Sequence, residues 1–387
     1  MGYTYLVLGA GRQGTASAYD LARNGDAEQV LIADRVPELV EKAAERLNAL
    51  LGSERIVPRV VDVGDRDALL DILTEADAAI SAVPYIFNLE ITRAAIGSGT
   101  SLNDLGGNTG IVRKQLELTG EAEKAGVSVV PDCGMGPGMN ISLAVYAMSF
   151  LDEPRDVFIW DGGLPQKPEP PWNYRLTFNI GGLTNEYYGN AYFLRDGKVT
   201  EVPCFEGYQL LDVPPLGKLE AFVTSGGLST APWTFEGKLR TLENRTLRYP
   251  GHHAQFKAFS DLGLLSLEPV RVGDIEVIPR DLFHALLEPK IYDPDVRDVG
   301  VIMVRVFGRK DGGEAEVTVK LVDYYDEETG FTAMQRLTGW HASIISILQA
   351  KGIVMPGAHP VEIAVPGELV VKEARKRGFD ISVKVKG

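Results

Sequence analysis

The sequence predicts an α/β protein with a doubly wound parallel sheet, followed by an α+β domain whose sheet is open and mainly antiparallel. Two observations predict the first part: a glycine-rich turn near the start, and apolar runs that alternate with helical segments up to residue 137. After residue 138, proline, glycine, aromatic and β-branched residues become frequent, which predicts the second part. We expect domains over 1–137 and 138–332, and a helical C-terminal segment over 333–387 that returns to the first domain.

The size and charge of the chain limit the classes of protein to which it can belong. Its 387 residues are many for a single hydrophobic core, which agrees with two domains. The formal charge of −14, without a basic run, argues against a nucleic-acid partner, and no apolar run reaches the length of a membrane span. The two cysteines, Cys133 and Cys204, are too few for a disulfide framework, so we expect reduced thiols in the cytoplasm.

The stretch YTYLVLGAGRQG, residues 3–14, joins a buried-strand signal to the pattern G-x-G-x-x-G. Gly9 permits a tight turn, Gly11 lets the backbone approach a pyrophosphate, and Gly14 lets a helix pack closely on the strand. A helical segment follows at once, and its first N–H groups offer a positive potential to phosphates. We interpret this stretch as a Rossmann-type dinucleotide-binding turn; the alternative is an ordinary βαβ turn with chance glycines.

The next apolar run, QVLIADR, closes on Asp34, 20 residues after Gly14. A dinucleotide-binding fold places at this position the acid that binds the adenosine ribose. A carboxylate here repels a 2′-phosphate, which favours NAD over NADP. Arg35 keeps NADP open as the alternative, because its guanidinium can stack on adenine or bind a 2′-phosphate.

The alternation of strands and helices continues beyond Asp34. We expect helices over 37–51, 65–74, 87–98 and 112–125, separated by three further strands. The carboxyl ends of parallel strands meet at one edge of a sheet, where ligands bind. Residues expected at this edge are Asp62 and Val63, beside the adenine, then Ala82, Val83 and Pro84, and finally Asn103, Asp104, Asp132 and Cys133.

The second half of the chain reads as strands with helices between them. VIMVRVFGRK and EAEVTVKLVDYYD alternate as antiparallel strands do, and Asp311-Gly312-Gly313 between them is a hairpin signal. HHAQFKAFSDLGLL and TAMQRLTGWHASIISILQAKG have helical patterns. An open sheet has edges and a face that need cover, so we expect a homodimer or a homotetramer.

Six segments in order give the chain a family resemblance. They are GAGRQG (9–14), ISAVPY (80–85), DCGMGPGMN (132–140), DGGLP (161–165), TLRYPGH (246–252) and MQRLTGWHAS (334–343). With them the chain resembles the saccharopine dehydrogenase (reductase)-like family, most closely its NAD-dependent L-lysine dehydrogenases. The first segment is common to many families, but the ordered set is specific, and the resemblance covers nearly the whole chain.

The resemblance implies oxidative deamination of the ε-amine of L-lysine. The products would be ammonia, NADH and 2-aminoadipate 6-semialdehyde, which cyclises to Δ1-piperideine-6-carboxylate. It adds Arg12 and Gln13 to the cofactor-binding residues. As substrate-binding candidates it implies Arg175, for a carboxylate, Arg248 and Tyr249, beside the cleft, and Asp132 and Thr338, within the shared segments.

Two positions depart from the saccharopine-forming enzymes of this family. Those enzymes carry an Asp before the Pro-Gly of the GPG turn, where this chain has Gly136. They also carry a Cys before GGLP, where this chain has Asp161. The pocket is therefore expected not to take saccharopine, and the carboxylate of Asp161 suits a free primary amine.

Amine oxidation needs a base and a nearby anion. An ammonium has no lone pair with which to expel a hydride, so the nitrogen must first lose a proton. His252 has the ordinary pKa for such a transfer near neutrality, and Asp161 and Asp104 could hold the amine and stabilise positive charge. Each also has an ordinary role as a loop histidine or a turn-forming aspartate. No spacing of His, Cys and carboxylates suggests a metal site.

Two other functions remain open from the sequence. One is an imine reductase of the same family that acts on saccharopine or carboxynorspermidine. The other is a non-catalytic regulator that senses a dinucleotide. Gly136 and Asp161 argue against saccharopine as the substrate. Arg175, Asp161 and His252 around one cleft would argue against the regulator, and a filled or missing cleft would support it.

Overall fold

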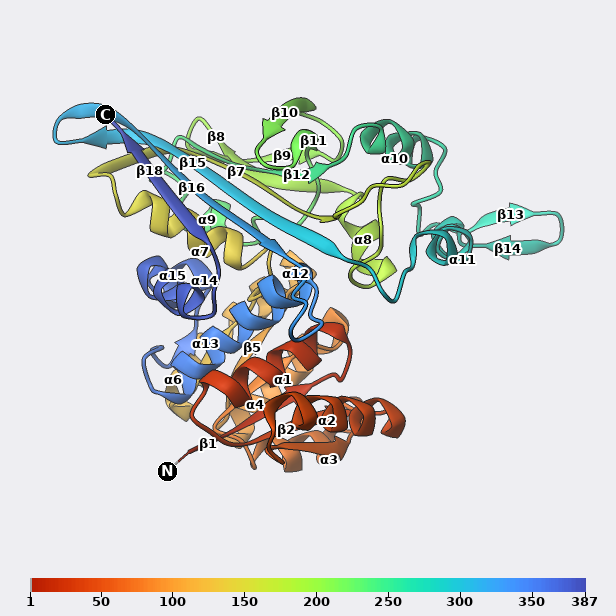
Figure 1. Ribbon diagram of the computed structural model, residues 1–387, viewed down its shortest axis with the longest axis vertical. Coiled ribbons are helices and arrows are strands. Elements are labelled where there is room, and N and C mark those ends of the chain that lie inside the picture. Colours follow the sequence, from red (N-terminus) through yellow and green to blue (C-terminus); the bar gives the residue numbers. More distant parts are fainter. Residues whose placement is uncertain (1) are drawn as a thin grey trace.

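The computed structural model describes residues 2–387 and contains two large sheets, one in each half of the molecule (Figure 1). The first is entirely parallel, with the order β17-β6-β5-β4-β1-β2-β3. Its strands are β1 (Tyr3–Leu8), β2 (Ala27–Asp34), β3 (Ile56–Val60), β4 (Ala78–Ser81), β5 (Ser101–Asp104), β6 (Ser128–Val130) and β17 (Gly357–Ala358). The predicted doubly wound parallel sheet is therefore confirmed.

Helices cover both faces of this sheet. They are α1 (Arg12–Asn24), α2 (Pro37–Leu51), α3 (Arg66–Leu73), the short 3₁₀ helix η1 (Tyr85–Phe87), α4 (Asn88–Ser98), α5 (Thr109–Leu116) and α6 (Thr119–Ala125). Alternate residues of β1 enter different cores: Tyr5 and Val7 pack with α1 and α2, while Leu6 and Leu8 pack with α3 and α4. Burial on both sides explains why the strands are continuous apolar runs in the sequence.

The prediction of one continuous helix over 112–125 is wrong, because two short helices, α5 and α6, occupy this segment. The break falls at Glu117–Leu118. It lets Leu116 and Leu118 pack against the same small core around Val127. Two residues that are two positions apart point in different directions from a continuous helix, so sharing one core requires the break.

The second sheet is mainly antiparallel, as expected, with the order β10-β11-β12-β7-β15-β16-β18 and a β8–β9 hairpin beside β12. Only the β7–β12 pair among these is parallel. Its strands are β7 (Glu153–Pro165), β8 (Asn190–Arg195), β9 (Lys198–Pro203), β10 (Gln209–Val213), β11 (Gly217–Phe222), β12 (Thr241–Arg248), β15 (Asp298–Lys310), β16 (Gly313–Tyr324) and β18 (Ile381–Lys386). Asp311 and Gly312 form the predicted turn between β15 and β16.

Helices pack against the second sheet, and one small hairpin projects from the body (Figure 1). The helices are α7 (Met139–Met148), α8 (Ile180–Glu186), α9 (Ala231–Thr234), α10 (His252–Asp261) and α11 (Pro279–Ile291). The projecting hairpin is β13 (Val270–Val272) with β14 (Ile275–Val277). Within residues 2–387, no helix has both the length and the apolar character needed to cross a membrane.

After β16 the chain returns to the first sheet. A continuous helical stretch, formed by α12 (Ala333–Gln335), a π-helical turn labelled η2 (Arg336–Trp340) and α13 (His341–Ala350), packs against α1, β4 and β5. Close approach depends on Gly339, because a Cβ there would lie 2.9 Å from the carbonyl oxygen of Gln13. Next, β17 extends the first sheet, α14 (Val361–Ala364) and α15 (Gly367–Lys376) pack on α7, and β18 pairs with β16.

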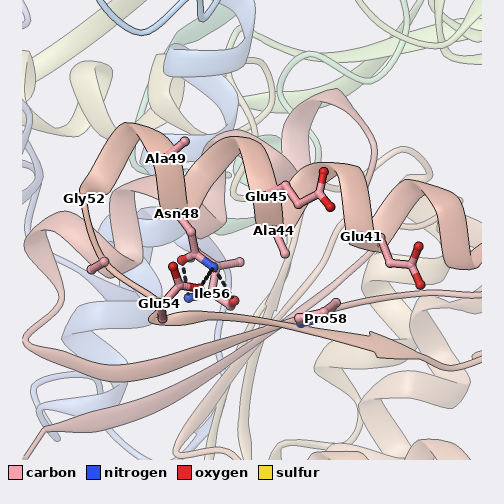
Figure 2. Close-up of a pocket in the computed structure, with 10 residues that line it drawn as sticks. Glu41, Ala44, Glu45, Asn48, Ala49, Gly52, Glu54, Ile56 and Pro58 are labelled. Atoms are coloured by element: carbon pink, nitrogen blue, oxygen red, sulfur yellow. Dashed lines mark hydrogen bonds between the residues drawn. The ribbon is translucent and has the colours of Figure 1, made fainter.

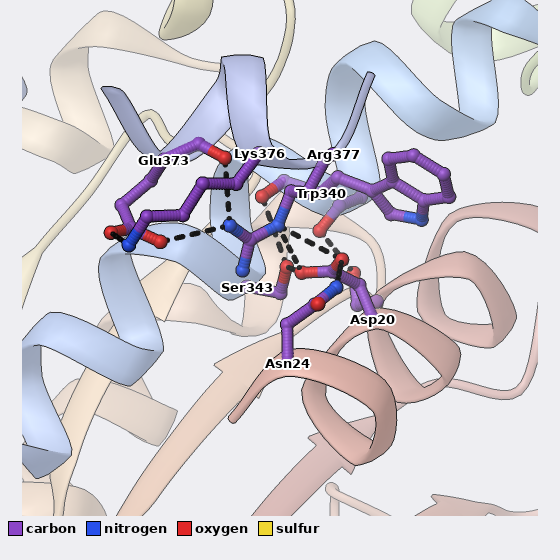
Figure 3. Close-up of polar contacts among 9 residues, drawn as sticks. Asp20, Asn24, Trp340, Ser343, Glu373, Lys376 and Arg377 are labelled. Atoms are coloured by element: carbon purple, nitrogen blue, oxygen red, sulfur yellow. Dashed lines mark hydrogen bonds and ion pairs between the residues drawn. The ribbon is translucent and has the colours of Figure 1, made fainter. Parts of the chain in front are cut away.

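A buried ion pair fastens this return (Figure 3). Arg377 follows α15, and its Nε lies 2.8 Å from Oδ2 of Asp20 on α1. The two side chains are 2% and 1% exposed. Asp20 also accepts hydrogen bonds from Asn24 and from Ser343 on α13, so one carboxylate joins three helical segments.

Candidate active site

The glycine turn after β1 has the geometry of a phosphate-binding loop. Gly9 has φ +106°, and a Cβ there would lie 2.7 Å from the carbonyl oxygen of Ala82. A Cβ at Gly14 would lie 1.9 Å from the carbonyl oxygen of Gly9. A Cβ at Gly11, in contrast, would meet no atom within 4 Å. The outer two glycines thus serve packing, and the middle one faces open space that a pyrophosphate can enter.

The surroundings of this turn also fit a dinucleotide. Helix α1 begins at Arg12 without an acidic residue in its first turn, so its first N–H groups remain available to an anion. Asp34, at the end of β2, accepts hydrogen bonds from the N–H of Ala10 at 3.0 Å and of Val36 at 3.1 Å. These bonds fix the carboxylate beside the glycine turn, and Arg35 next to it is exposed.

The remaining predicted cofactor residues lie at the same edge of the sheet, but their side chains point in different directions. Ala82 continues β4 beside the glycine turn, and Pro84 precedes η1. Asp62 is exposed, whereas Val63 and Val83 pack against the core formed with α3 and α4. The side chain of Arg12 points to the other domain, where it donates to the carbonyl oxygens of Leu176 and Asp293 at 3.2 and 3.3 Å. The Gln13 side-chain oxygen is buried and has no hydrogen-bond partner within residues 2–387.

Asp161 lies on β7, on the sheet face that also carries α7. Its Oδ2 accepts hydrogen bonds from Asn140 of α7 at 2.7 Å and from Asn244 of β12 at 3.0 Å. Burial raises the pKa of Asp161 to about 6, against the effect of these bonds and of Arg248. A Cβ at Gly136 would lie 2.9 Å from the same Oδ2. The two positions at which the chain departs from its family pattern are therefore neighbours in space.

Arg248, at the end of β12, joins Asp161 to a second acid. Its Nη2 donates to Oε2 of Glu186, at the end of α8, at 3.0 Å, and its Nε donates to the hydroxyl of Tyr187 at 3.0 Å. Although 30% of the Glu186 side chain is exposed, loss of solvent around its carboxyl raises its pKa to about 7. Arg248 lowers the pKa of Glu186, and Asp161 raises it. The guanidinium of Arg248 thus pairs directly with Glu186 and acts on Asp161 only through its charge.

His252 reaches this group only through Tyr187. It begins α10, is 1% exposed, and its ring stacks on Phe256 with the centroids 4.0 Å apart. Its Nε2 lies 2.9 Å from the Tyr187 hydroxyl. Burial, reinforced by Arg248, holds the pKa of His252 well below 6.5, so the ring is neutral. Its expected role as a proton acceptor for substrate stays a prediction.

Asp104 and Asp132 shape the junction between the domains. Asp104 ends β5, is fully buried, and accepts hydrogen bonds from the N–H of Gly106 and from the side chain of Gln115, each at 2.7 Å. Asp132 is also buried and accepts a hydrogen bond from the hydroxyl of Ser229. Burial raises the pKa of both carboxyls, and Asp104 adds to the effect on Asp132. Their hydrogen bonds go to groups of the chain itself, so the role of Asp104 in holding an amine stays a prediction.

The other predicted substrate residues lie apart from the Asp161 cluster. Arg175 stands in a loop, next to the Leu176 carbonyl that Arg12 contacts, and it pairs with Glu169 and Asp293. Thr338, in η2, donates to the sulfur of Met334.

Tyr249 packs on the opposite sheet face from Arg248, because successive residues of a strand point to opposite faces. Its hydroxyl donates to the carbonyl oxygen of Pro165 at 3.1 Å. The side chain that joins the Arg248 cluster is instead Tyr187, which the sequence analysis did not select.

Four residues of the cluster were not predicted from the sequence: Asn140, Glu186, Tyr187 and Asn244. Asn140 closes the DCGMGPGMN segment, which was a signal for it. Glu186 and Tyr187 stand in TNEYYG, which matches no motif, and Asn244 sits in an ordinary strand sequence.

A groove on the first domain is a separate feature (Figure 2). It lies between α2 and β3, holds about 730 Å³, and is lined by Glu41, Glu45 and Glu54 among others. The side-chain amide of Asn48, in the centre of the groove, is already hydrogen-bonded to both the N–H and the carbonyl of Ile56. The groove borders the start of β3, away from the carboxyl ends of the strands where the glycine turn lies. It is therefore not the candidate site. No group of three or more potential ligands is placed to hold a metal ion among the residues that the structure describes.

A dinucleotide-binding domain set against a domain with a buried, charged cluster is the architecture of a two-domain NAD(P)-binding protein. Residues 5–130 match the saccharopine dehydrogenase NADP binding domain, and residues 134–378 match the saccharopine dehydrogenase C-terminal domain. The chain therefore belongs to the saccharopine dehydrogenase family.

Curated relatives and a solved structure extend this finding. The chain is 26% identical over 286 residues to saccharopine dehydrogenase [NADP(+), L-glutamate-forming] of Saccharomyces cerevisiae, which covers 68% of this chain and 59% of the relative. It is 25% identical over 274 residues to the mitochondrial alpha-aminoadipic semialdehyde synthase of Mus musculus, covering 68% and 28%. The chain thus matches less than two thirds of the length of either relative. The apo saccharopine dehydrogenase (L-Glu forming) from Saccharomyces cerevisiae has the same fold, with a TM-score of 0.80 over 100% of both chains at 22% identity.

Proposed function

We propose that the protein is an NAD-dependent dehydrogenase that oxidises the ε-amine of L-lysine. The products are 2-aminoadipate 6-semialdehyde, which cyclises to Δ1-piperideine-6-carboxylate, together with ammonia and NADH. One observation carries the proposal: Asp161 and Glu186 lie around the single cation Arg248. When both acids are ionised the cluster has one negative charge in excess, which suits the ammonium group of a primary amine.

The chain's own residues then divide the chemistry. Asp161 holds the nitrogen and stabilises the positive charge that develops as the carbon–nitrogen double bond forms. Asn140 and Asn244 fix the Asp161 carboxylate through one oxygen, Oδ2, which leaves Oδ1 for the substrate. A bound nicotinamide supplies the hydride acceptor. Water adds to the iminium carbon, and ammonia leaves.

The other end of lysine needs a cation for its carboxylate. Arg12 and Arg175 meet at the domain junction, because Arg12 donates to the carbonyl of the residue that follows Arg175. A guanidinium can grip a carboxylate through two parallel hydrogen bonds. With the amine at Asp161, a guanidinium at this junction would receive the carboxylate of the same amino acid, in place of the acids Glu169 and Asp293 that now pair with Arg175.

The choice of NAD rests on Asp34. Its carboxylate is held beside the glycine turn, where it would accept hydrogen bonds from a ribose and repel a 2′-phosphate. The name of the yeast relative specifies NADP(+), so both cofactors belong in the test.

A second candidate is an imine reductase of the same family that acts on saccharopine or carboxynorspermidine, and the name of the yeast relative specifies saccharopine. The geometry around Gly136 speaks for the first candidate. A side chain at this position would collide with the Asp161 carboxylate, since a Cβ there lies only 2.9 Å from Oδ2. This chain therefore has its carboxylate on β7, and it has no room for another on the turn.

The deciding experiment is reduction of NAD or NADP, followed at 340 nm, with purified protein and a panel of amines. The panel contains L-lysine, L-ornithine, saccharopine and carboxynorspermidine. We expect turnover with lysine and NAD, and one ammonia released per NADH formed. Activity on saccharopine or carboxynorspermidine alone would establish the imine reductase. Tight NAD binding without turnover of any amine would support the dinucleotide-sensing regulator.

We also propose that the chain forms a homodimer or a homotetramer. The edge strands of the second sheet, β10 and β18, carry the exposed apolar residues Leu210 and Val385. Open edges pair readily with another chain. Light scattering on a size-exclusion column tests this, and a mass near 42.1 kDa, that of one chain, would contradict it.

A further inference from the structure

The two carboxylates around Arg248 differ in their access to water. Asp161 is 7% exposed, and its Oδ2 already accepts two amide hydrogen bonds. The Glu186 side chain is 30% exposed, and it makes one hydrogen bond, to Arg248, through Oε2. A group that removes a proton in every turnover must also pass that proton on to water. Of these two acids, Glu186 has the more exposed side chain and the fewer hydrogen bonds.

The pKa values of the two acids also differ, and the more exposed acid, Glu186, has the higher value. Burial raises the pKa of both acids, to about 6 for Asp161 and about 7 for Glu186, and the charge of Asp161 adds to the effect on Glu186. Of the two, Glu186 is therefore the acid that holds a proton more readily near neutral pH. Environments that separate the acidities of two neighbouring acids mark different roles, one as a fixed charge and one as a proton carrier.

The other candidate bases lie behind this pair or away from it. His252 is 1% exposed, stacks on Phe256, and contacts the cluster only through the Tyr187 hydroxyl. Asp104 is fully buried, and both of its oxygens accept hydrogen bonds from the chain. Both side chains are buried and their polar contacts are with the chain itself, so neither combines contact with solvent and a free oxygen as Glu186 does.

We infer that Glu186 is the general base that takes a proton from the substrate ammonium, while Asp161 holds the nitrogen. This inference rests on the proposed function. The ammonium R–CH₂–NH₃⁺ gives one proton to the Glu186 carboxylate and becomes R–CH₂–NH₂. The nitrogen lone pair then forms the C=N bond as the C–H bonding pair leaves as hydride to the oxidised nicotinamide, which is reduced. Water adds to the carbon of R–CH=NH₂⁺, a proton passes from the added oxygen to the nitrogen, and the carbon–nitrogen bond breaks to give the aldehyde R–CHO and ammonium, NH₄⁺. Glu186 returns its own proton to solvent.

Arg248 keeps Glu186 in place and limits its basicity. The guanidinium of Arg248 lies 3.0 Å from the Glu186 carboxylate, and its side chain is only 3% exposed. It therefore stays beside Glu186 as a permanent positive charge. It favours the ionised form of Glu186, which offsets part of the effect of burial. Without it the carboxyl would be a weaker acid and would stay protonated at neutral pH.

The test compares Glu186→Gln, Glu186→Asp and the wild-type protein in lysine oxidation between pH 6 and pH 10. General-base catalysis is worth about 10²–10⁴-fold, so Glu186→Gln should lose this factor in kcat/KM at pH 7. Its rate should recover towards pH 10, because the ε-ammonium loses its own proton near about pH 10.4. Glu186→Asp keeps a carboxylate and should retain an acid limb, displaced from the wild-type limb near pH 7.

The control is Glu314→Gln. Glu314 also pairs with an arginine, Arg155, at 3.0 Å, but 69% of its side chain is exposed and it lies on β16, away from the cluster. This variant should keep the wild-type rate and pH profile. Thermal unfolding of each variant separates loss of folding from loss of chemistry.

The outcomes distinguish two failures. If the wild-type protein oxidises no primary amine, the proposed function fails and this inference fails with it. If the wild type oxidises lysine and Glu186→Gln keeps its acid limb and a rate within tenfold, only the role of Glu186 is overturned. A higher KM with an unchanged kcat would also overturn it, because Glu186 would then bind the amine without removing its proton.

Discussion

Two of the buried arginine side chains, those of Arg377 and Arg248, have surroundings that differ in charge. Arg377 pairs with Asp20 and with Glu373, and Glu373 also pairs with Lys376, so two acids face two bases (Figure 3). Arg248 faces Glu186 directly and lies near Asp161, so two acids face one base. The first group joins the C-terminal segment to α1 and is neutral as a whole. The second group lies at the candidate active site and carries an excess negative charge.

This difference shows how the same residue types serve structure in one place and chemistry in another. A buried charge is costly unless it is paired, so a structural group is expected to balance. The cluster at Arg248 contains one more acid than base, and burial raises the pKa of both Asp161 and Glu186. A bound ammonium would complete the balance. An unmatched buried charge is thus a better guide to the site than a buried charge alone.

The largest effect on stability is expected from Arg377→Met. It leaves Asp20, which is 1% exposed, without its cation, and breaking a buried pair in this way costs about 3–5 kcal/mol. Urea unfolding followed by circular dichroism measures the loss, and the activity of the folded fraction should not change. Lys376→Met is the matched control, because Lys376 is 59% exposed and its pair with Glu373 is worth little. Equal losses in the two variants would contradict the structural role of the Asp20–Arg377 pair.

Asp161→Asn should have the opposite effects, a large loss of activity and a gain in stability. The amide keeps the shape and still accepts from Asn140 and Asn244, but it cannot neutralise a cation, so kcat/KM for the amine should fall about 10²–10³-fold. Stability at neutral pH should rise by up to about 2–3 kcal/mol, because burial raises the pKa of Asp161 from 3.8 to about 6.

The sign of this stability change follows from the shift of Asp161. A folded-state pKa above the unfolded value makes a contribution to stability that is complete below about pH 4 and is lost as the pH rises through about 6. The variant should lack that part of the pH dependence. Unfolding titrations at pH 4 and pH 7 measure it. A stability difference between wild type and variant that is the same at both pH values would contradict this account.

The smallest effect is expected from Tyr187→Phe. It removes the hydroxyl that accepts from Arg248 and contacts His252, while the ring keeps its place against Phe205 and Phe222. One net hydrogen bond is worth about 1 kcal/mol, so we expect a three- to tenfold lower kcat/KM and a similar small loss of stability. Steady-state kinetics with lysine measures the first. A loss as large as that of Asp161→Asn would mean that Tyr187 itself takes part in the chemistry.

The parallel sheet could be predicted because its signals are local. The helix predicted over 37–51 matches α2 to the residue, and the glycine turn stands where the pattern placed it. The strand β18 could not be predicted to join the second sheet, since its partner β16 lies some 60 residues earlier. The break between α5 and α6 depends on a core that includes Ala358, far along the chain.

The candidate site divides in the same way. Asp161 could be selected because it begins a recognisable segment, DGGLP. Glu186 could not, because what sets it apart is its distance from Arg248, 62 residues further along. Tyr249 was chosen as a neighbour of Arg248 in sequence, but alternation along the strand turns it to the other face. Pairings across the fold leave no pattern in a single sequence.

The position of α13 has a consequence for synthesis of the protein on the ribosome. This helix buries Ile344, Ile345 and Leu348 against α1 and the first sheet, and β17 then adds the last strand. The ribosome completes β6 roughly 200 residues before it makes α13, a delay on the order of 10–40 s at usual elongation rates. During that time the second domain emerges, while the part of the first sheet that α13 covers, over β4 and β5, has no helix on it. The first domain therefore reaches its full core only when the chain returns from the second domain.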